Sequence, residues 1–293
     1  MNNIKAAILK YLFTKIEKDF NNRRYESEIK KLNFVLILNP IAFNFSLRGG
    51  IYKILRNYNQ AIKDFTKAIS LEPNNADFLG SRASCYADAS QLELAIDDYN
   101  KALIIAPDDD RLFLFRAQAF QDKGEFEKAI SDFNEVLKLN PSDIESYIDK
   151  GICLRNLKRY DEAIETYNLG LKLHPNTTEL YVNLGIAISH QGNPESISKS
   201  LDYFDKALQI DEKNYYATYN KGISLYQMDR FDEALDSFNK TTEINPDYAF
   251  AYIYKGHIYF AQNQKELAVQ NYLRAKELGE NIDDFINELN EKK

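Results

Sequence analysis

The side chains that could catalyse a reaction are few in this chain, and they lie far apart in the sequence. The three histidines, His174, His190 and His257, and the two cysteines, Cys85 and Cys153, stand in separate segments. The sequence contains no H-E-x-x-H metal motif, no C-x-x-C pair, no Walker phosphate loop and no G-x-G-x-x-G loop. We therefore expect no catalytic residues, no metal site and no cofactor.

The composition narrows the class of partner. The chain carries a net charge of −7 and has no block of lysine or arginine, which argues against nucleic acid, because phosphate binding needs a concentrated basic patch. No apolar run is long enough for membrane insertion. The first apolar run is interrupted by Lys10 and lacks a cleavage site, so we expect no signal peptide. We expect the two cysteines to be small buried residues in a reducing compartment. Together with the missing signal peptide and membrane segment, they predict a cytoplasmic location.

The elements that would position any functional residue are visible in the segment 144–177. Two runs in it, 145–156 and 161–172, carry apolar or small residues at helical spacing. A short link joins the two runs, and Pro175 ends the second, because the residue before a proline disfavours helix. One such helical hairpin cannot bury its apolar faces alone, so it requires copies of itself on both sides.

Copies of this segment recur through the chain. Five prolines, from Pro40 to Pro175, follow one another at intervals of 33 or 34 residues, and Pro246 lies 71 residues further on. A small residue stands at place 8 and at place 20 of nearly every copy, and an aromatic ring at place 24. Two antiparallel helices can touch only where neither carries a large side chain, so the small places mark the helix contact. Place 8 reads Gly49, Ala83, Ala117, Gly151, Gly185, Gly222 and Gly256.

This pattern resembles the tetratricopeptide repeat family. The resemblance implies an all-α fold, a right-handed α-solenoid of about eight helix-turn-helix repeats that forms a single domain over residues 1–293. In the sixth repeat, residues 192–195 are expected to extend the turn between the helices by three residues, and residues 282–293 are expected to form a C-terminal capping helix. The predicted repeats are 9–41 (degenerate), 42–75, 76–109, 110–143, 144–177, 178–214, 215–248 and 249–281.

A correlation inside the repeats predicts ion pairs. Arginine occupies place 7 only in the repeats that have aspartate at place 23. We expect each arginine to meet its aspartate between the two helices of the repeat, where a partly exposed pair contributes about 0–1 kcal/mol. The expected pairs are Arg48–Asp64, Arg82–Asp98 and Arg116–Asp132.

The first helices leave one stripe, places 2, 5, 6, 9, 12 and 13, that the helix contact does not use. Stacking would turn this stripe into the inner wall of the superhelix, which resembles the peptide-binding surface of tetratricopeptide repeat adaptors. In repeats three to five these places are polar with mixed charge, whereas in repeats six to eight they are largely aromatic. Aromatic residues at helical spacing equally serve as core, so each one has both interpretations. The candidate groove residues are Asn183, Ile186, His190, Tyr216, Tyr219, Asn220, Ile223, Tyr226, Phe250, Tyr254 and His257.

Three functions fit these observations to different degrees. The first is a non-catalytic scaffold that binds a peptide or protein segment in the groove, chiefly in repeats six to eight. The second is a structural subunit of a larger assembly that associates through its ends or outer face, self-association included. The third, an enzyme or an enzyme's targeting arm, is disfavoured because we expect no second domain beside the repeats in this sequence. The groove places that grip acidic heat-shock chaperone tails in the family hold cations only as Lys10 and Arg111, which argues against that partner.

Overall fold

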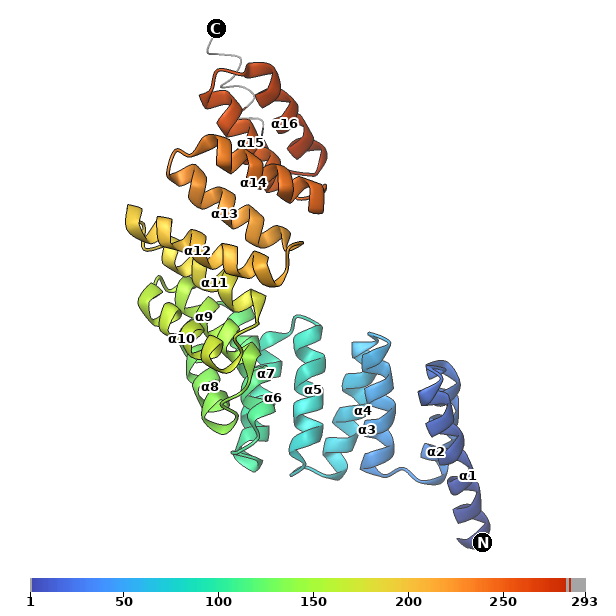
Figure 1. Ribbon diagram of the computed structural model, residues 1–293. Coiled ribbons are helices and arrows are strands. Elements are labelled where there is room, and N and C mark those ends of the chain that lie inside the picture. Colours follow the sequence, from blue (N-terminus) through green and yellow to red (C-terminus); the bar gives the residue numbers. More distant parts are fainter. Residues whose placement is uncertain (1, 283–284, 286–293) are drawn as a thin grey trace. The chain divides into compact units, whose positions relative to one another are not determined.

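The computed structural model describes the backbone of residues 2–282 and 285, and the side chains of these residues outside 2–4 and 18–21. The regular structure of the described residues is entirely helical, which confirms the all-α fold (Figure 1). The helices are α1 (Asn2–Asn21), α2 (Tyr25–Leu38), α3 (Ala42–Ile54), α4 (Tyr58–Leu71), α5 (Ala76–Asp88), α6 (Leu92–Ile105), α7 (Asp110–Asp122), α8 (Phe126–Leu139), α9 (Ile144–Asn156), α10 (Tyr160–Leu173), α11 (Thr178–Ser189), α12 (Pro194–Ile210), α13 (Tyr215–Gln227), α14 (Phe231–Ile244), α15 (Ala249–Ala261) and α16 (Lys265–Glu277).

These helices belong to two compact units, Met1–Pro141 with α1 to α8 and Ser142–Lys293 with α9 to α16. Within each unit, consecutive helices pack as pairs, and the second helix of one pair contacts the first helix of the next. Each predicted repeat from 42–75 onward contains one such pair, whereas α1 of the first pair begins at Asn2, before the predicted first repeat 9–41. The pairs stack as in a tetratricopeptide-like solenoid. Continuity of one solenoid over the whole chain stays a prediction. The predicted capping helix lies almost entirely outside the described residues.

The contact inside each helix pair is as close as the small residues at place 8 require. A Cβ atom added to Gly185 would lie 2.7 Å from the ring of Phe204, and one added to Gly222 would lie 2.7 Å from the ring of Phe238. Both rings are completely buried. The aromatic side chain at place 24 therefore occupies the space that a missing side chain leaves open on the facing helix.

The turns use two local devices. A residue in the left-handed region, for example Ser90 or Gly124, follows the first helix of every pair in the described chain. The two helices of a pair are joined by three residues, or by four between α11 and α12. After three of the proline turns, an asparagine or aspartate side chain, Asn75, Asp109 or Asp143, caps the next first helix. The Asp143 carboxylate, for example, accepts a hydrogen bond from the Ser146 amide at 2.8 Å. These devices set the helix ends where the period of 34 places them.

The three predicted arginine–aspartate pairs form, and each is bidentate. The six bonds from arginine Nε and Nη2 to the carboxylates of Asp64, Asp98 and Asp132 measure 2.6–2.8 Å. These carboxylates are buried, whereas the sequence led us to expect partly exposed pairs. Removing one partner of a buried pair therefore destabilises the fold more than removing one partner of an exposed pair. The remaining guanidinium nitrogen of each arginine donates to the second helix of the preceding pair, to Asn33, Thr66 or Asn100. Each arginine thus ties three helices together.

Filling the small place should destabilise the fold. We expect Gly185→Val to lower the free energy of unfolding by about 1–3 kcal/mol, because the added atoms collide with Phe204. Urea unfolding followed by circular dichroism measures this change. Gly50→Val is the matched control, since a Cβ at Gly50 meets no atom within 4 Å. Equal midpoints for the two variants would contradict the assigned helix contact.

Removing one arginine should leave a buried charge. We expect Arg82→Ala to lower the free energy of unfolding by about 3 kcal/mol, because the Asp98 carboxylate loses two hydrogen bonds where water has little access. Lys138→Ala, which breaks an exposed pair with Glu135, should change it by no more than about 0.5 kcal/mol. Similar losses in both variants would show that the arginine pairs behave as surface pairs.

Candidate protein-binding surface

The first helices of successive pairs touch one another within each unit. In the C-terminal unit, α9 contacts α11, α11 contacts α13, and α13 contacts α15. The corresponding contacts in the N-terminal unit join α3 to α5 and α5 to α7. The stripe predicted from the sequence therefore lies on a row of adjacent helices in both units.

The structure separates the predicted groove residues into three groups. Tyr216 and Phe250, both at place 2, are 45% and 46% exposed, and His190 is also exposed. Ile186 and Tyr219 are buried, Tyr219 to 9% exposure, and both belong to core clusters. The partly exposed remainder comprises Asn183, Asn220, Ile223, Tyr226, Tyr254 and His257.

Tyr254 connects the buried and exposed aromatic rings. Its ring stacks on the buried Phe238 ring at 5.4 Å and meets the Tyr219 and Tyr226 rings edge-on at 6.0 and 5.4 Å. The Tyr219 ring in turn contacts Tyr248 at 4.8 Å. This network packs α13, α14 and α15 together and holds Tyr226 and Tyr254 in fixed positions at the surface.

Burial moves the pKa values of the phenols in this network further above neutral pH. Loss of solvent raises the pKa of Tyr219 and Tyr254, and raises the pKa of Tyr248 to about 12. At neutral pH these groups are therefore uncharged hydrogen-bond donors and acceptors. A wall of this kind offers large apolar area together with polar tips, and it repels no approaching anion or cation.

The two asparagines at place 6 are held by their own helices. The Asn183 amide nitrogen donates to the Glu179 carbonyl at 2.9 Å, and that of Asn220 donates to the Tyr216 carbonyl at 2.7 Å. A carboxamide has two N–H groups and an oxygen that accepts two bonds. Each side chain can therefore make this helix bond and still donate to and accept from a peptide backbone.

The histidines are placed by packing. The His190 ring meets the Tyr160 ring edge-on at 5.6 Å, and partial loss of solvent on that side, together with the Arg155 charge, lowers its pKa. His257 Nδ1 lies 2.8 Å from the Tyr272 hydroxyl.

Cys85 and Cys153 are buried free thiols, as expected from the sequence, and burial raises their pKa values to about 11 and about 12. Among the described residues, no three metal-ligating side chains come together.

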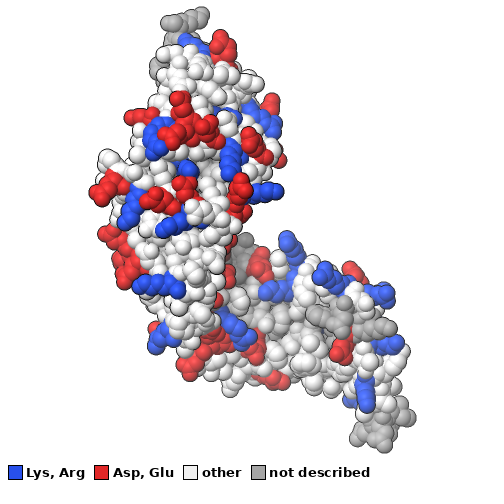
Figure 2. Space-filling view, viewed as in Figure 1, with Lys and Arg blue, Asp and Glu red and all other residues white. Residues whose placement is uncertain are grey.

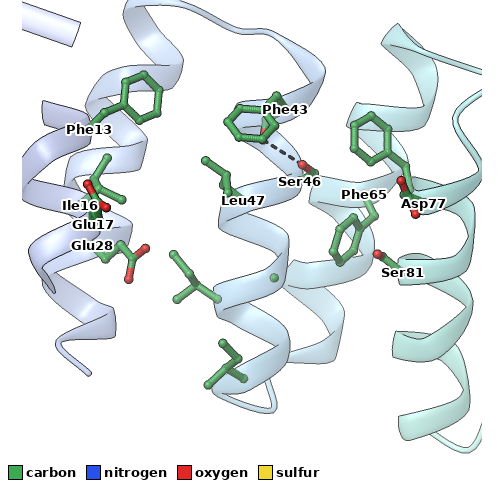
Figure 3. A pocket seen from close by; sticks show the side chains of 14 residues that line it. Phe13, Ile16, Glu17, Glu28, Phe43, Ser46, Leu47, Phe65, Asp77 and Ser81 are labelled. Atoms are coloured by element: carbon green, nitrogen blue, oxygen red, sulfur yellow. Dashed lines mark hydrogen bonds between the residues drawn. The ribbon is translucent and has the colours of Figure 1, made fainter. Parts of the chain in front are cut away.

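The sequence interpretation missed an apolar pocket in the N-terminal unit. The pocket has a volume of about 670 Å³ and lies between α1, α3 and α5 (Figure 3). Reading the same stripe in the repeat 42–75 would have found it, because Phe43, Leu47 and Ile54 occupy places 2, 6 and 13. In the degenerate first repeat, Phe13 stands at place 5 of the same stripe, whereas Ile16 occupies the small-residue place 8 and carries no such signal.

Comparison with known proteins identifies the repeat. Models of the tetratricopeptide repeat match residues 55–110, 116–178, 215–248 and 251–281, which is more than half of the chain. No helix in the described part of the chain combines the length and apolarity needed to span a membrane.

Solved structures share the fold. A tetratricopeptide repeat protein from Parabacteroides merdae is 21% identical, with a TM-score of 0.68 over 85% of this chain and 96% of that chain. YrrB, described as a repeat protein of this kind with an unusual peptide-binding site, is 22% identical, with a TM-score of 0.52 over 64% of this chain and 95% of its own.

One curated relative matches part of the sequence. Anaphase-promoting complex subunit 3 of Schizosaccharomyces pombe is 31% identical over 74 residues. The match spans 25% of this chain and only 11% of that subunit.

Core and wall tyrosines should respond differently to truncation. We expect Tyr219→Ala to lower the free energy of unfolding by about 3 kcal/mol, because it opens a cavity beside Phe238. Tyr216→Ala, three residues away and half exposed, should change it by about 0.5 kcal/mol or less. Urea unfolding of the two variants checks this, and a comparable loss in Tyr216→Ala would place that side chain in the core as well.

Proposed function

Because this chain belongs to the tetratricopeptide repeat family, whose domains mediate protein binding, we propose that it is a non-catalytic protein-binding scaffold. Its C-terminal unit would hold a partly apolar peptide or protein segment against the first-helix stripe of α11, α13 and α15. The observation that carries this proposal is the pair of half-exposed aromatic rings, Tyr216 and Phe250, at equivalent places on adjacent helices. Large aromatic side chains that stay accessible beside a rigid network are frequent anchors of protein interfaces.

Each group of the stripe has a distinct part in this proposal. Tyr216 and Phe250 supply apolar area for the side chains of the bound segment. The phenols of Tyr226 and Tyr254 and the amides of Asn183 and Asn220 supply hydrogen bonds to its backbone. Ile186 and Tyr219 support the wall from the core. Because the aromatic network is already packed, little conformational entropy is lost when the segment binds.

The surface charge supports a protein partner. On the face shown in Figure 2, acidic and basic side chains are intermixed, in keeping with a net charge of −7 and without the broad basic area that a nucleic acid needs. We call the candidate groove residues between Asn183 and His257 the C-terminal wall. This wall also lacks the cations that an acidic chaperone tail requires, since its residues are aromatic, aliphatic, amide or histidine. The two buried thiols fit the proposed cytoplasmic location.

Affinity capture from a native lysate tests the wall. We expect Tyr216→Ala combined with Phe250→Ala to lower the affinity for the captured protein by about tenfold or more, because both aromatic anchors are removed while the core remains. The control variant combines Leu94→Ala with Ile104→Ala, which truncates exposed apolar side chains of α6. All variants must first show the wild-type unfolding midpoint.

The pattern of bands decides the outcome. A protein retained by the wild type and the control, and lost by the wall variant, supports the proposal and names the ligand. Equal retention by all three would contradict binding at this wall.

A structural subunit of an assembly is the second candidate. Apolar side chains on second helices, Ile37 and Ile104, are among the most exposed in the described chain. The similarity to an anaphase-promoting complex subunit also points to assembly partners. In that case the α6 control variant, and not the wall variant, would lose the captured protein.

A further inference from the structure

We propose that the last helix pair, α15 and α16, binds a side-chain carboxylate of a partner protein on the side that faces away from the first-helix stripe. The site is a hollow of about 590 Å³ that residues of these two helices line. Two observations carry the proposal. Three earlier repeats hold an arginine–aspartate pair at the equivalent places, and here a cation remains while the aspartate is replaced by asparagine.

The hollow lies on the opposite side of α15 from the first-helix stripe. Its α15 residues, Tyr252, Lys255 and Tyr259, stand at places 4, 7 and 11 of the repeat, whereas the stripe uses places 2, 5, 6, 9, 12 and 13. With about 3.6 residues per turn, the two sets of places point in nearly opposite directions around the helix axis. The site is therefore separate from the C-terminal wall, whose Phe250 stands at place 2.

The repeat pattern identifies the group that this hollow lacks. In the repeat with Arg82 at place 7, the Asp98 carboxylate at place 23 accepts two hydrogen bonds from the guanidinium, of 2.6 and 2.8 Å. In the repeat 249–281 the same two places hold Lys255 and Asn271, and both residues line the hollow. Asn271 is buried and carries no charge. The hollow thus contains the cation of the pair without its carboxylate.

A lysine at place 7 pairs with a carboxylate elsewhere in the C-terminal unit. Lys221, in the repeat 215–248, donates to the Asp205 carboxylate of α12 at 2.6 Å. A lysine side chain is therefore long enough to hold a carboxylate from this place. Lys255 is the same residue at the same place of the next repeat.

Lys255 is partly buried without an acid in contact. Its ammonium nitrogen lies 5.3 Å from the centre of the Tyr252 ring, and no described carboxylate lies within ion-pair distance of it. Loss of solvent lowers the pKa of Lys255, and the exposed Glu243 of α14 offsets part of this effect from a greater distance. A carboxylate brought into contact would replace the lost solvation of the ammonium with a charge-assisted hydrogen bond.

The other charges that line the hollow are paired with each other. Arg274 donates to the Glu277 carboxylate at 3.0 Å and lies 3.6 Å from the Asp247 carboxylate. The negative charge of these two acids is therefore largely compensated. Of the two cations in the described lining, Lys255 is the one that a carboxylate from outside can pair with.

Apolar side chains border the cation and extend the site beyond one ion pair. Leu267 and Leu273 of α16 line the hollow and are 39% and 46% exposed. An ion pair at a surface contributes little by itself, whereas apolar area removed from water adds to it. The ligand that fits is a segment of a partner protein with aspartate or glutamate next to a large apolar residue.

Peptide selection compares the wild type with a variant that supplies its own carboxylate. Asn271→Asp restores the aspartate of place 23 and so occupies Lys255 from within the chain. A random-peptide phage library is first depleted on Asn271→Asp and then selected on the full wild-type chain. We expect the retained peptides to combine aspartate or glutamate with a large apolar residue.

The affinity of one synthetic selected peptide is then measured by fluorescence anisotropy. It should fall about tenfold in Lys255→Met, which removes the charge and keeps an apolar stem, and about tenfold in Asn271→Asp. In the wild type it should weaken as salt is raised.

Two control variants should leave this affinity unchanged. Lys199→Met removes the same charge from an exposed position on α12. Tyr216→Ala combined with Phe250→Ala removes the anchors of the C-terminal wall, so that the failure of one site is distinguishable from the failure of the other.

Urea unfolding tests the approach of the two places without a ligand. Asn271→Asp should lower the unfolding midpoint more in Lys255→Met than in the wild type, because the buried carboxylate then has no cation. Equal shifts in the two backgrounds would show that a carboxylate at place 23 does not meet Lys255, and would contradict the site.

Three other results would overturn the proposal. The first is a selection that retains no acidic peptides. The second is a peptide affinity that Lys255→Met leaves unchanged. The third is a wild-type dimer by light scattering that Lys255→Met dissociates, which would assign the hollow to a second copy of this chain.

Discussion

The close approach of the two helices in each pair is the constraint on which the rest of the structure depends. A glycine or alanine at place 8 leaves a space that one buried ring fills, as Phe204 does opposite Gly185. Because the ring comes from a fixed place on the second helix, it sets the rotation of both helices about their axes. The remaining stripe of the first helix must then face away from the pair, and this is the stripe that can meet a partner.

The two units stabilise their helix pairs with different polar groups. In the N-terminal unit, arginines such as Arg116 join three helices through buried aspartates and a neighbouring amide. In the C-terminal unit, buried hydroxyls meet instead. Those of Thr218 and Thr241 lie 3.0 Å apart within one pair, and those of Ser200 on α12 and Ser224 on α13 lie 2.9 Å apart between neighbouring pairs. Both solutions give buried polar atoms a hydrogen-bond partner. A buried polar atom without a partner would destabilise the packing of the helices.

The first-helix stripes likewise differ in chemistry. In the C-terminal unit the stripe is a packed aromatic surface with amides beside it, suited to apolar area and backbone hydrogen bonds. In the N-terminal unit it opens into a pocket whose lining charges are negative. One repeat pattern can therefore present two chemically distinct surfaces, because the exposed places of the stripe, such as place 2 with Tyr216 and Phe250, do not take part in the helix contact that restricts places 8, 20 and 24.

The sequence by itself determined the all-α fold, the helix pairs of the regular repeats and the three arginine–aspartate pairs. These features follow from local spacing and from a period of 34 that repeats often enough to be unambiguous.

Tertiary structure alone decided which stripe residues are accessible. Tyr216 and Tyr219 look alike in the sequence, yet the first is half exposed and the second is buried against Phe238. The pocket beside Glu28 also needed the fold, because its lining comes from separate helices, one of them in a repeat that lacks the regular pattern. Burial depends on the neighbours that stacking brings together, and a one-dimensional period does not contain them.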